Sequence, residues 1–324
     1  MAPSSPKSIK GVVSGYVGRI TKRFTKSTHP QATSSSHIDV PETSQAATMS
    51  KPVFYTFGHS VWAAAAELAI AELGYADDAI ETKVVNLVEG ANFTPDFLKI
   101  NPNGTLPTLV ADGKAFTNTK DVVHYLVEHA PKKVASGTAF VDTIHEDRLD
   151  PNLPIFLARN EEELKANASG FSFVFADNRQ KALEKYSELP EAASFKGFHD
   201  AKKAGNGGVL AILKGEVPDA VKDGFFTQSV QHWETLAAYI TNELPAALPE
   251  TGPFLGGAAP GEDDFHLGAW LARLVFLTQG TADKDGYKSL EKETKGPVSP
   301  KVAAYWAAWV ERASFKKVYA NGLH

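Results

Sequence analysis

Strand-type and helix-type segments alternate between residues 51 and 130, whereas from there to the end of the chain only helical periodicity continues. The first region predicts a strand, a crossover helix and a parallel strand, followed by a short helix, a hairpin and a closing helix. The expected elements, in the order β-α-β-α-β-β-α, are 52–57, 61–73, 81–88, 94–100, 105–110, 115–117 and 121–129. We therefore expect an α/β domain at residues 51–130 and an all-α domain at residues 141–324, which gives an α+β chain.

The all-α domain is expected to contain five amphipathic helices, at 153–168, 173–189, 225–244, 264–278 and 300–313. Residues 190–221, between the second and the third, contain Gly205, Gly207, Gly208 and several lysines. This composition favours a surface loop or an insertion.

Residues 1–48 form a tail that is rich in Ser and Thr, and up to His37 it carries only basic charges. Apolar residues recur in it at helical spacing: Ile9, Val13, Tyr16, Val17, Ile20 and Phe24. The pattern predicts a disordered basic tail with a short amphipathic segment. This segment could act as a mitochondrial-type transit peptide or as a membrane-surface helix, and the alternative is that it is a solvated extension. Met49 directly precedes the first expected strand and is an alternative start of translation.

Several classes of chemistry are excluded by composition. The chain has no cysteine, which rules out disulfides, Cys-based metal sites and a protein thiolate nucleophile. Its formal net charge of −5 offers nucleic acid no general attraction. The longest apolar run, 61–70, is interrupted by Glu67 and is shorter than the roughly 20 residues of a membrane-spanning helix. P-loop, G-x-G-x-x-G, G-x-S-x-G and H-E-x-x-H motifs are absent. We expect no metal, no nucleic-acid partner and no membrane span.

Two histidines, His124 and His129, share one expected helix. They are five residues apart, which does not place both rings on one face as a spacing of four would. We interpret them as surface or capping residues.

The most informative stretch, residues 97–110, reads Phe-Leu-Lys-Ile-Asn-Pro-Asn-Gly-Thr-Leu-Pro-Thr-Leu-Val and is followed by Asn118-Thr119 and Tyr125-Leu126. In order and spacing it resembles the cytosolic glutathione S-transferases, in particular the fungal and theta-like, serine-type members. Pro253-Phe254-Leu255-Gly256, Asp264 and Tyr305-Trp306 extend the resemblance into the second region. It implies a thioredoxin-like domain followed by the all-α domain of that family. It also implies a homodimer and a cytoplasmic location, with mitochondrial import through the tail as the alternative.

Leu106 and Pro107 are the first candidate binding residues. A proline at the start of a strand cannot donate to the ladder, so the neighbouring main chain stays available to a ligand. The resemblance implies a cis Leu106–Pro107 bond and main-chain pairing of Leu106 with the cysteinyl part of glutathione, the co-substrate. The alternative is an ordinary turn proline.

Ser60 is the candidate catalytic residue, because it ends a turn and opens the helix that stops at Gly74. A serine at this place can simply cap the helix, which contributes roughly 1 kcal/mol. The resemblance to the serine-type transferases implies a second role, because in those enzymes the serine at this position donates a hydrogen bond to the glutathione sulfur. Tyr55, as in a tyrosine-type enzyme, and the neighbouring His59 are weaker candidates.

The remaining glutathione contacts depart from the family pattern. Asn118 and Thr119 stand where an acidic residue and a serine receive the γ-glutamyl group, so a charged contact becomes a neutral one. Asn92 and Thr105 stand where cationic partners of the glycyl carboxylate are frequent. Each lost charged hydrogen bond is expected to weaken binding by roughly 1.5–3 kcal/mol.

A pocket for an apolar electrophile is expected between the domains. The aromatic residues expected to line it, or else to be ordinary core, are Phe156, Phe171, Phe173 and Phe175. Asp264 is expected to cap its helix, with Gly261 in place of the usual Ser or Thr partner. The function implied is transfer of glutathione thiolate to an apolar electrophile in detoxification or secondary metabolism. The alternative is a non-catalytic protein that binds ligands or proteins.

Overall fold

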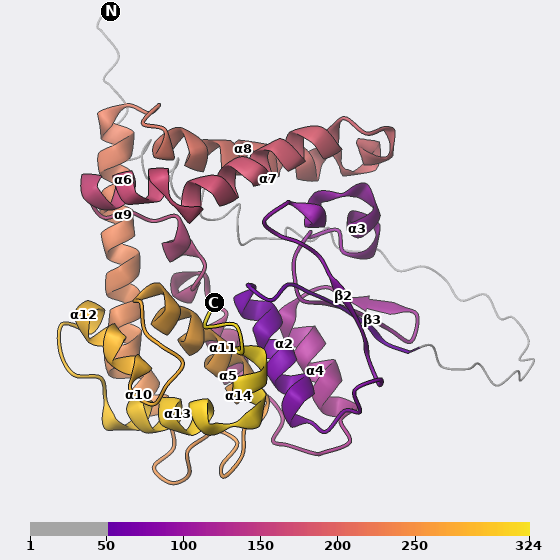
Figure 1. Cartoon of the computed structure of the whole chain (residues 1–324), viewed down its shortest axis with the longest axis vertical. Helices are drawn as coiled ribbons and strands as arrows, with labels where there is room; N and C mark the ends of the chain where they lie inside the picture. Colours follow the sequence, from indigo (N-terminus) through magenta and orange to yellow (C-terminus); the bar gives the residue numbers. More distant parts are fainter. Residues whose placement is uncertain (1–50) are drawn as a thin grey trace, which may run out of the picture.

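The computed structural model describes residues 51–324 (Figure 1). The predictions for the basic tail at 1–48 and for Met49 lie outside these residues.

The first region forms a four-stranded sheet with strand order β2-β1-β3-β4. β1 runs parallel to β2 and antiparallel to β3, and β3 pairs antiparallel with β4. Its elements are β1 (Val53–Thr56), α2 (Val61–Glu72), β2 (Glu81–Val84), η1 (Ala91–Phe93), α3 (Pro95–Ile100), β3 (Thr108–Ala111), β4 (Lys114–Phe116) and α4 (Thr119–Glu128). The expected order β-α-β-α-β-β-α is confirmed, and it is a thioredoxin-like arrangement.

The second region is helical throughout. Its elements are α5 (Ala139–Ile144), η2 (Asp147–Leu149), η3 (Leu153–Ile155), α6 (Glu161–Ser169), α7 (Phe171–Ser187), η4 (Pro190–Phe195), α8 (Lys196–Leu213), α9 (Asp219–Ala238), the π-helical turn η5 (Tyr239–Glu243), α10 (Leu244–Ala247), α11 (Glu262–Leu277), η6 (Gly286–Leu290), α12 (Glu291–Thr294), α13 (Pro300–Glu311) and α14 (Ala313–Val318). The expectation of an α/β domain followed by an all-α domain is therefore confirmed.

Helix α2 joins the two domains through its small side chains. Ala63 to Ala66 are fully buried, and α2 packs against α11 on one side and α4 on another. Alanines allow this close approach because they bury no long side chain between the helix axes. Gly74, at φ +77°, follows the helix in the left-handed conformation that glycine adopts without strain.

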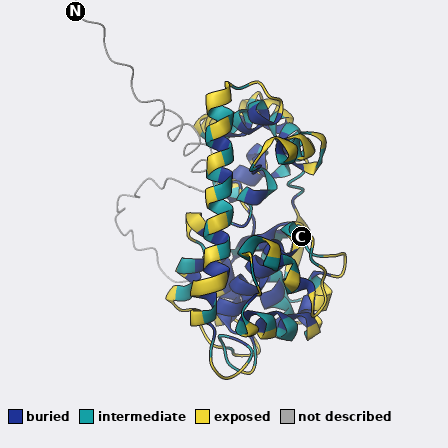
Figure 2. Cartoon of the chain, turned by 90° about the vertical axis from the view of Figure 1, so that its left-hand side faces the viewer, coloured by how far each residue is buried: buried dark blue, intermediate teal, exposed yellow. Residues whose placement is uncertain are grey.

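Helix α11 is the centre of the helical domain. Its residues from Glu262 to Val275 are all buried, whereas the long helix α9 has one side exposed to solvent (Figure 2). The Asp264 carboxylate accepts hydrogen bonds from the N–H groups of Leu255, Gly256 and Gly261 at 2.8–2.9 Å. Burial raises the pKa of Asp264 to about 6, although these three bonds oppose the shift. The capping role expected for Asp264 is confirmed, and Gly261 contributes only main chain.

The prediction of a surface loop at residues 190–221 is wrong, because most of this segment forms the helix α8. Its buried side chains recur at helical spacing and include Val209, Leu210 and Leu213. The Nδ2 group of Asn206 donates to the carbonyl oxygen of Ala176 in α7 at 2.8 Å. Packing of this face against α7 outweighs the low helix propensity of the glycines.

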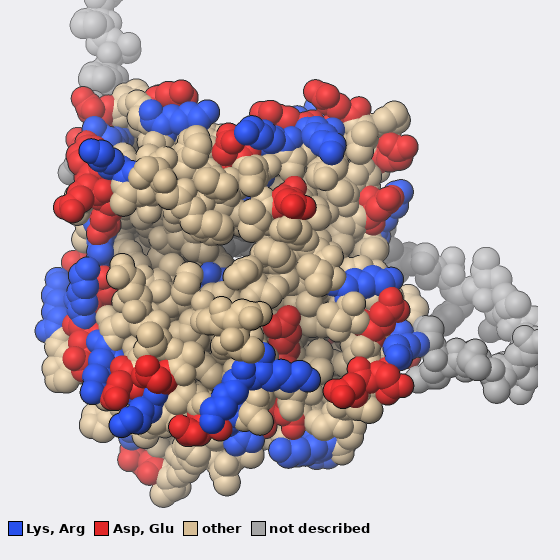
Figure 3. Space-filling view, viewed as in Figure 1, with Lys and Arg blue, Asp and Glu red and all other residues tan. Residues whose placement is uncertain are grey.

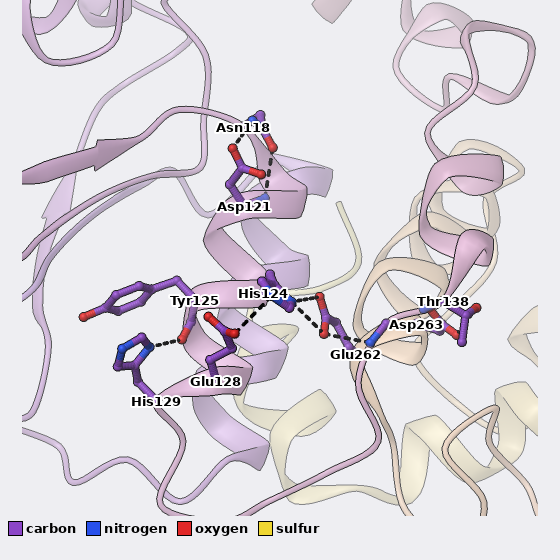
Figure 4. Close-up of polar contacts among 10 residues, drawn as sticks. Asn118, Asp121, His124, Tyr125, Glu128, His129, Thr138, Glu262 and Asp263 are labelled. Atoms are coloured by element: carbon purple, nitrogen blue, oxygen red, sulfur yellow. Dashed lines mark hydrogen bonds and ion pairs between the residues drawn. The ribbon is translucent and has the colours of Figure 1, made fainter. Parts of the chain in front are cut away.

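A polar seam fixes the start of α11 to α4 and to the linker after it (Figure 4). The Glu262 carboxylate accepts from the N–H of Gly137 at 2.8 Å and lies 3.1 Å from Nδ1 of His124. Asp263 accepts from the N–H and the hydroxyl of Thr138. His124 is exposed and His129 is the C-cap of α4, which confirms their interpretation as surface or capping residues.

Candidate active site

Three chain segments meet at one edge of the sheet. Tyr55, near the end of β1, lies opposite Thr108 at the start of β3, so the turn 57–60 lies beside residues 106–107. β4 runs antiparallel to β3, which brings residues 117–119 to the same edge. The sheet therefore gathers the starts of α2 and α4 around the chain that enters β3.

Ser60 is the N-cap of α2. Its Oγ accepts a hydrogen bond from the N–H of Ala63 at 3.3 Å, and the residue is 9% exposed. This bond uses an acceptor lone pair, so the hydroxyl proton can still be donated to another group. The cap expected as the simpler role is present, and it leaves a donor at the positive end of the helix dipole.

Arg273 of α11 adds positive charge to the start of α2. Its Nη2 donates to the carbonyl oxygen of His59 at 2.7 Å, and its side chain is buried. Burial lowers the pKa of Arg273 to about 10. Within residues 51–324 it forms no ion pair with a carboxylate. The sequence analysis missed Arg273, although a single arginine in the apolar run of α11 was a signal for it.

Tyr55 and His59 occupy different surroundings from Ser60. The ring of Tyr55 packs on Phe97 of α3, with ring centres 5.8 Å apart. His59 is exposed, and its ring lies 5.7 Å from that of His324. His324 is buried near Arg273, and burial lowers its pKa to about 4.

The Leu106–Pro107 peptide bond is cis, as the resemblance implied. Neither the N–H nor the C=O of Leu106 takes part in a hydrogen bond among the described residues. The turn before it is fixed instead by Asn101, whose Nδ2 donates to Thr105 O at 2.9 Å and to Thr108 Oγ1 at 2.8 Å. Leu106 thus offers one donor and one acceptor to an extended peptide.

Asn118 and Thr119 lie at the start of α4. Asn118 Oδ1 accepts from the N–H of Asp121 at 2.9 Å, and its Nδ2 donates to Asp121 Oδ2 at 2.7 Å (Figure 4). Thr119 is the first residue of the helix and is buried. The first N–H groups of such a helix are free of partners within the helix and suit an anion such as a carboxylate.

Asn92 and Thr105 lie farther along the turn. Asn92 is 2% exposed, and its Nδ2 donates to the carbonyl oxygen of Gly104 at 2.7 Å. Thr105 is exposed, and its hydroxyl donates to Thr117 O at 3.3 Å. Both side chains hold the turn that presents Leu106.

The four phenylalanines expected at an apolar pocket divide into two groups. Phe156, Phe175 and Phe171 form a stack of nearly parallel rings with centres 5.8 and 5.5 Å apart, and Phe171 is 58% exposed. Phe173 is not part of this stack and packs against the core that contains Leu164, which Phe156 also contacts. The surface is hollowed below the α7–α8 hairpin, and mostly uncharged side chains surround the hollow (Figure 3).

A separate pocket of about 480 Å³ lies at the opposite edge of the sheet, beside the β3–β4 hairpin. Its lining residues include Asp112, Lys114, Phe116, Tyr125 and His129. Within residues 51–324, no group of three or more His, Cys, Asp or Glu side chains is arranged so that it could hold a metal ion. No helix in the same part of the chain is long and apolar enough to cross a membrane.

Comparisons with known proteins agree with this geometry. Residues 54–134 match the family model "Glutathione S-transferase, N-terminal domain". Among curated proteins, glutathione S-transferase D7 of Drosophila melanogaster is 39% identical over 49 residues, which are 15% of this chain and 22% of that protein. Probable maleylacetoacetate isomerase 1 of the same organism is 30% identical over 84 residues, 25% of this chain and 33% of that one. The chain thus matches a third or less of the length of either relative.

Among solved structures, beta-etherase LigF from Sphingobium sp. strain SYK-6 superposes with a TM-score of 0.52. The two share 14% identity, and the alignment covers 84% of this chain and all of LigF, which supports the fold alone. The first domain therefore matches the N-terminal domain of the glutathione S-transferases, and the two domains together share the fold of LigF.

Proposed function

We propose that the chain is a serine-type glutathione transferase that adds the thiolate of glutathione to an apolar electrophile. One observation carries the proposal: the unpaired main chain of Leu106 lies at the same sheet edge as Ser60, a hydroxyl at a helix start. An extended peptide that pairs with Leu106 brings its thiol toward this helix start.

The helix start and the hydroxyl supply enough stabilisation for a thiolate. A free thiol titrates near about 8.5, and lowering that pKa by about two units requires roughly 2.7 kcal/mol. A helix N-terminus contributes roughly 1–2 kcal/mol, and a donor to an anion adds roughly 1.5–3 kcal/mol. The first turn of α2 contains no acidic residue to oppose this effect.

The other contacts of glutathione follow from the same sheet edge. The γ-glutamyl carboxylate is held at the start of α4 by main-chain N–H groups and Thr119. The thiol gives its proton to water, and its sulfur forms a bond to the electrophilic carbon as the bond from that carbon to its leaving group, such as halide, breaks. The stacked rings of Phe156, Phe171 and Phe175 offer an apolar electrophile a surface below α7. We also propose that the protein is cytoplasmic and dimeric, as its family resemblance implies.

A non-catalytic binding protein is the second candidate. It is favoured by the neutral Asn118, whose side chain is already bonded to Asp121, and by the buried Asn92. Neither residue offers a charge to glutathione. The absence of cysteine argues against the thiol–disulfide reductase branches of the family, because mixed-disulfide exchange needs a protein thiol.

Calorimetry with glutathione, together with a conjugation assay with an aryl halide, distinguishes the two candidates. A transferase binds glutathione and releases halide as the carbon–sulfur bond forms. Binding without turnover favours the non-catalytic protein. A protein that does not bind at millimolar glutathione contradicts the proposed function.

A further inference from the structure

The pocket beside the β3–β4 hairpin, which we call the hairpin groove, has an aromatic floor. It lies along α4, and its volume is about 480 Å³. Among its lining residues, Ala111 and Tyr125 are buried and Phe116 is half-buried. The ring of Tyr125 lies 4.8 Å from that of Phe116 and stacks on that of His129 at 4.0 Å. Figure 4 shows Tyr125 and His129 on the same side of α4. The groove thus offers a surface of aromatic rings to apolar side chains.

The exposed carboxylates that line the groove are those of Asp112, Asp121 and Glu128. Within the described residues 51–324, no Lys or Arg forms an ion pair with any of the three. Asp112 accepts a hydrogen bond from the hydroxyl of Tyr125 at 3.0 Å. Lys114 is the cation among the lining residues, and its Nζ lies 4.7 Å from the ring centre of Phe116. The groove therefore carries an excess of negative charge around an apolar floor.

The segment 9–26 of the same chain, which lies outside the described residues, has the complementary sequence pattern. Its apolar residues recur at helical spacing from Ile9 to Phe24. It contains no acidic residue, and its cations are Lys10, Arg19, Lys22, Arg23 and Lys26. Arg19 and Lys26 are seven residues apart, as are Asp121 and Glu128. On a helix this spacing corresponds to about 10 Å along one face, so both charge pairs can meet at once.

Strand β1 brings the chain into the sheet close to the groove. Its first residue, Val53, pairs with Val110 of β3, which in turn pairs with Ala115 of β4. The start of β1 is thus two strand spacings, about 10 Å, from β4. Residues 27–52 span at most about 90 Å when extended, so the segment 9–26 can reach every part of the groove. Because the segment is tethered, its effective concentration there is in the millimolar range, at which a weak site is occupied.

We propose that residues 9–26 dock in the hairpin groove of their own chain. The apolar stripe lies on the rings of Phe116 and Tyr125, and the cations face the three carboxylates. A second copy that docked through the same groove would bring identical carboxylates together across a two-fold axis, whereas the segment 9–26 brings opposite charge. The proposal does not depend on the transferase activity. The rival interpretation is that the carboxylates are solvated and the groove stays open.

Limited trypsin digestion of the full chain tests the proposal, because a docked segment is cut more slowly after Lys22 and Arg23. The groove variant is Asp112→Asn/Glu128→Lys. Its matched control, Asp77→Asn/Asp78→Lys, changes the charge equally at two exposed carboxylates between α2 and β2, beside the far edge of the sheet. Thermal unfolding verifies that both are folded. A tail variant, Arg19→Gln/Lys26→Gln, leaves the described residues unchanged and keeps the test valid if the groove variant does not fold.

Mass spectrometry measures the cleavage rate. If the segment docks, the groove and tail variants are cut about three- to tenfold faster than the wild type, and the control is cut at the wild-type rate. Equal rates in all four proteins overturn the proposal. Faster cleavage in the control as well as in the groove variant also overturns it, because the effect is then one of overall charge.

A disulfide cross-link locates the segment, since the chain has no cysteine of its own. Thr21→Cys is combined with Lys114→Cys in the groove, or with Lys83→Cys on β2 as the control. Docking predicts a disulfide within one chain for the first pair and none for the second. A disulfide between two chains, or protection that rises with protein concentration, assigns the groove to the segment of a second copy and overturns docking within one chain.

Discussion

Arg273 Nη2 donates a 2.7 Å hydrogen bond to the carbonyl oxygen of His59, a residue 214 positions earlier in the chain and adjacent to Ser60. The bond ties α11 of the helical domain to the turn that starts α2. Together with the packing of α2 on α11, this bond fixes the position of the candidate catalytic serine.

Arg273→Met should lower the free energy of unfolding by about 1.5–3 kcal/mol, because it removes a buried hydrogen bond from a charged donor. Urea unfolding measures the loss. Arg148→Met is the control, since Arg148 is 39% exposed and its ion pairs with Glu146 and Glu243 contribute little. Equal stability of the two variants contradicts the role given to Arg273.

The sheet and the position of Ser60 were predictable because both depend on local patterns. The short β-rich run before the Ala-rich helix placed Ser60 at a helix start, and hydrogen bonding confirms it as the cap. The turn before Pro107 was predictable as well, because Pro107 belongs to a sequence motif, residues 97–110, that includes the residues of this turn. Strand ends were less certain: β2 was expected to extend to residue 88 but ends at Val84, although the N–H of Val85 still donates to the carbonyl oxygen of Thr56.

Features that depend on tertiary packing were not predictable. Gly205, Gly207 and Gly208 suggest a loop, yet they lie in α8 because its apolar face packs on α7. Similarly, one helix expected at 153–168 is interrupted between η3 and α6, where Asn160 caps a new helix. The cation Arg273 reaches its place beside His59 only when the two domains come together.

Gly104→Ala should destabilise the protein by about 2–4 kcal/mol. Its φ of +61° is strained for alanine, and the new Cβ would lie 2.7 Å from Phe198 Cζ and 3.2 Å from Asn92 O. Gly113→Ala is a matched control, because its φ of +71° imposes a similar strain with nothing within 4 Å. Its expected loss is about 1 kcal/mol. Equal losses in urea unfolding would show that the Phe198 contact is not restrictive.

Acid should destabilise the protein through His145 and His266, whose Nε2 and Nδ1 atoms lie 2.9 Å apart. Burial lowers the pKa of His145 to about 3 and that of His266 well below its ordinary value. Because the folded protein favours the neutral rings, their contribution is complete above about pH 6.5 and is lost progressively as the pH falls toward 3.

Two such groups give a slope approaching about 2.7 kcal/mol per pH unit in that range. Urea unfolding between pH 7.5 and 5 measures it, and His145→Asn should remove about half of the slope. If the wild type and the variant show the same slope, the histidine pair does not determine acid stability.

The central claim is that Ser60 stabilises the thiolate of bound glutathione, and Ser60→Ala tests it most directly. The variant removes one donor to sulfur but keeps the main chain of Leu106 and the dipole of α2. Glutathione binding should change little, while the pKa of the bound thiol rises by roughly one to two units. Turnover near neutral pH should fall about ten- to a hundredfold and recover as the pH is raised. The free energy of unfolding falls by roughly 1 kcal/mol whether or not Ser60 donates to the sulfur, because the variant also loses the cap of α2.

The decisive measurement is a titration of the bound thiolate by its ultraviolet absorbance in the wild type, in Ser60→Ala and in Tyr55→Phe. The account predicts a curve shifted to higher pH for Ser60→Ala and an unshifted curve for Tyr55→Phe. Superimposable curves for the wild type and Ser60→Ala, or a shift confined to Tyr55→Phe, would contradict it.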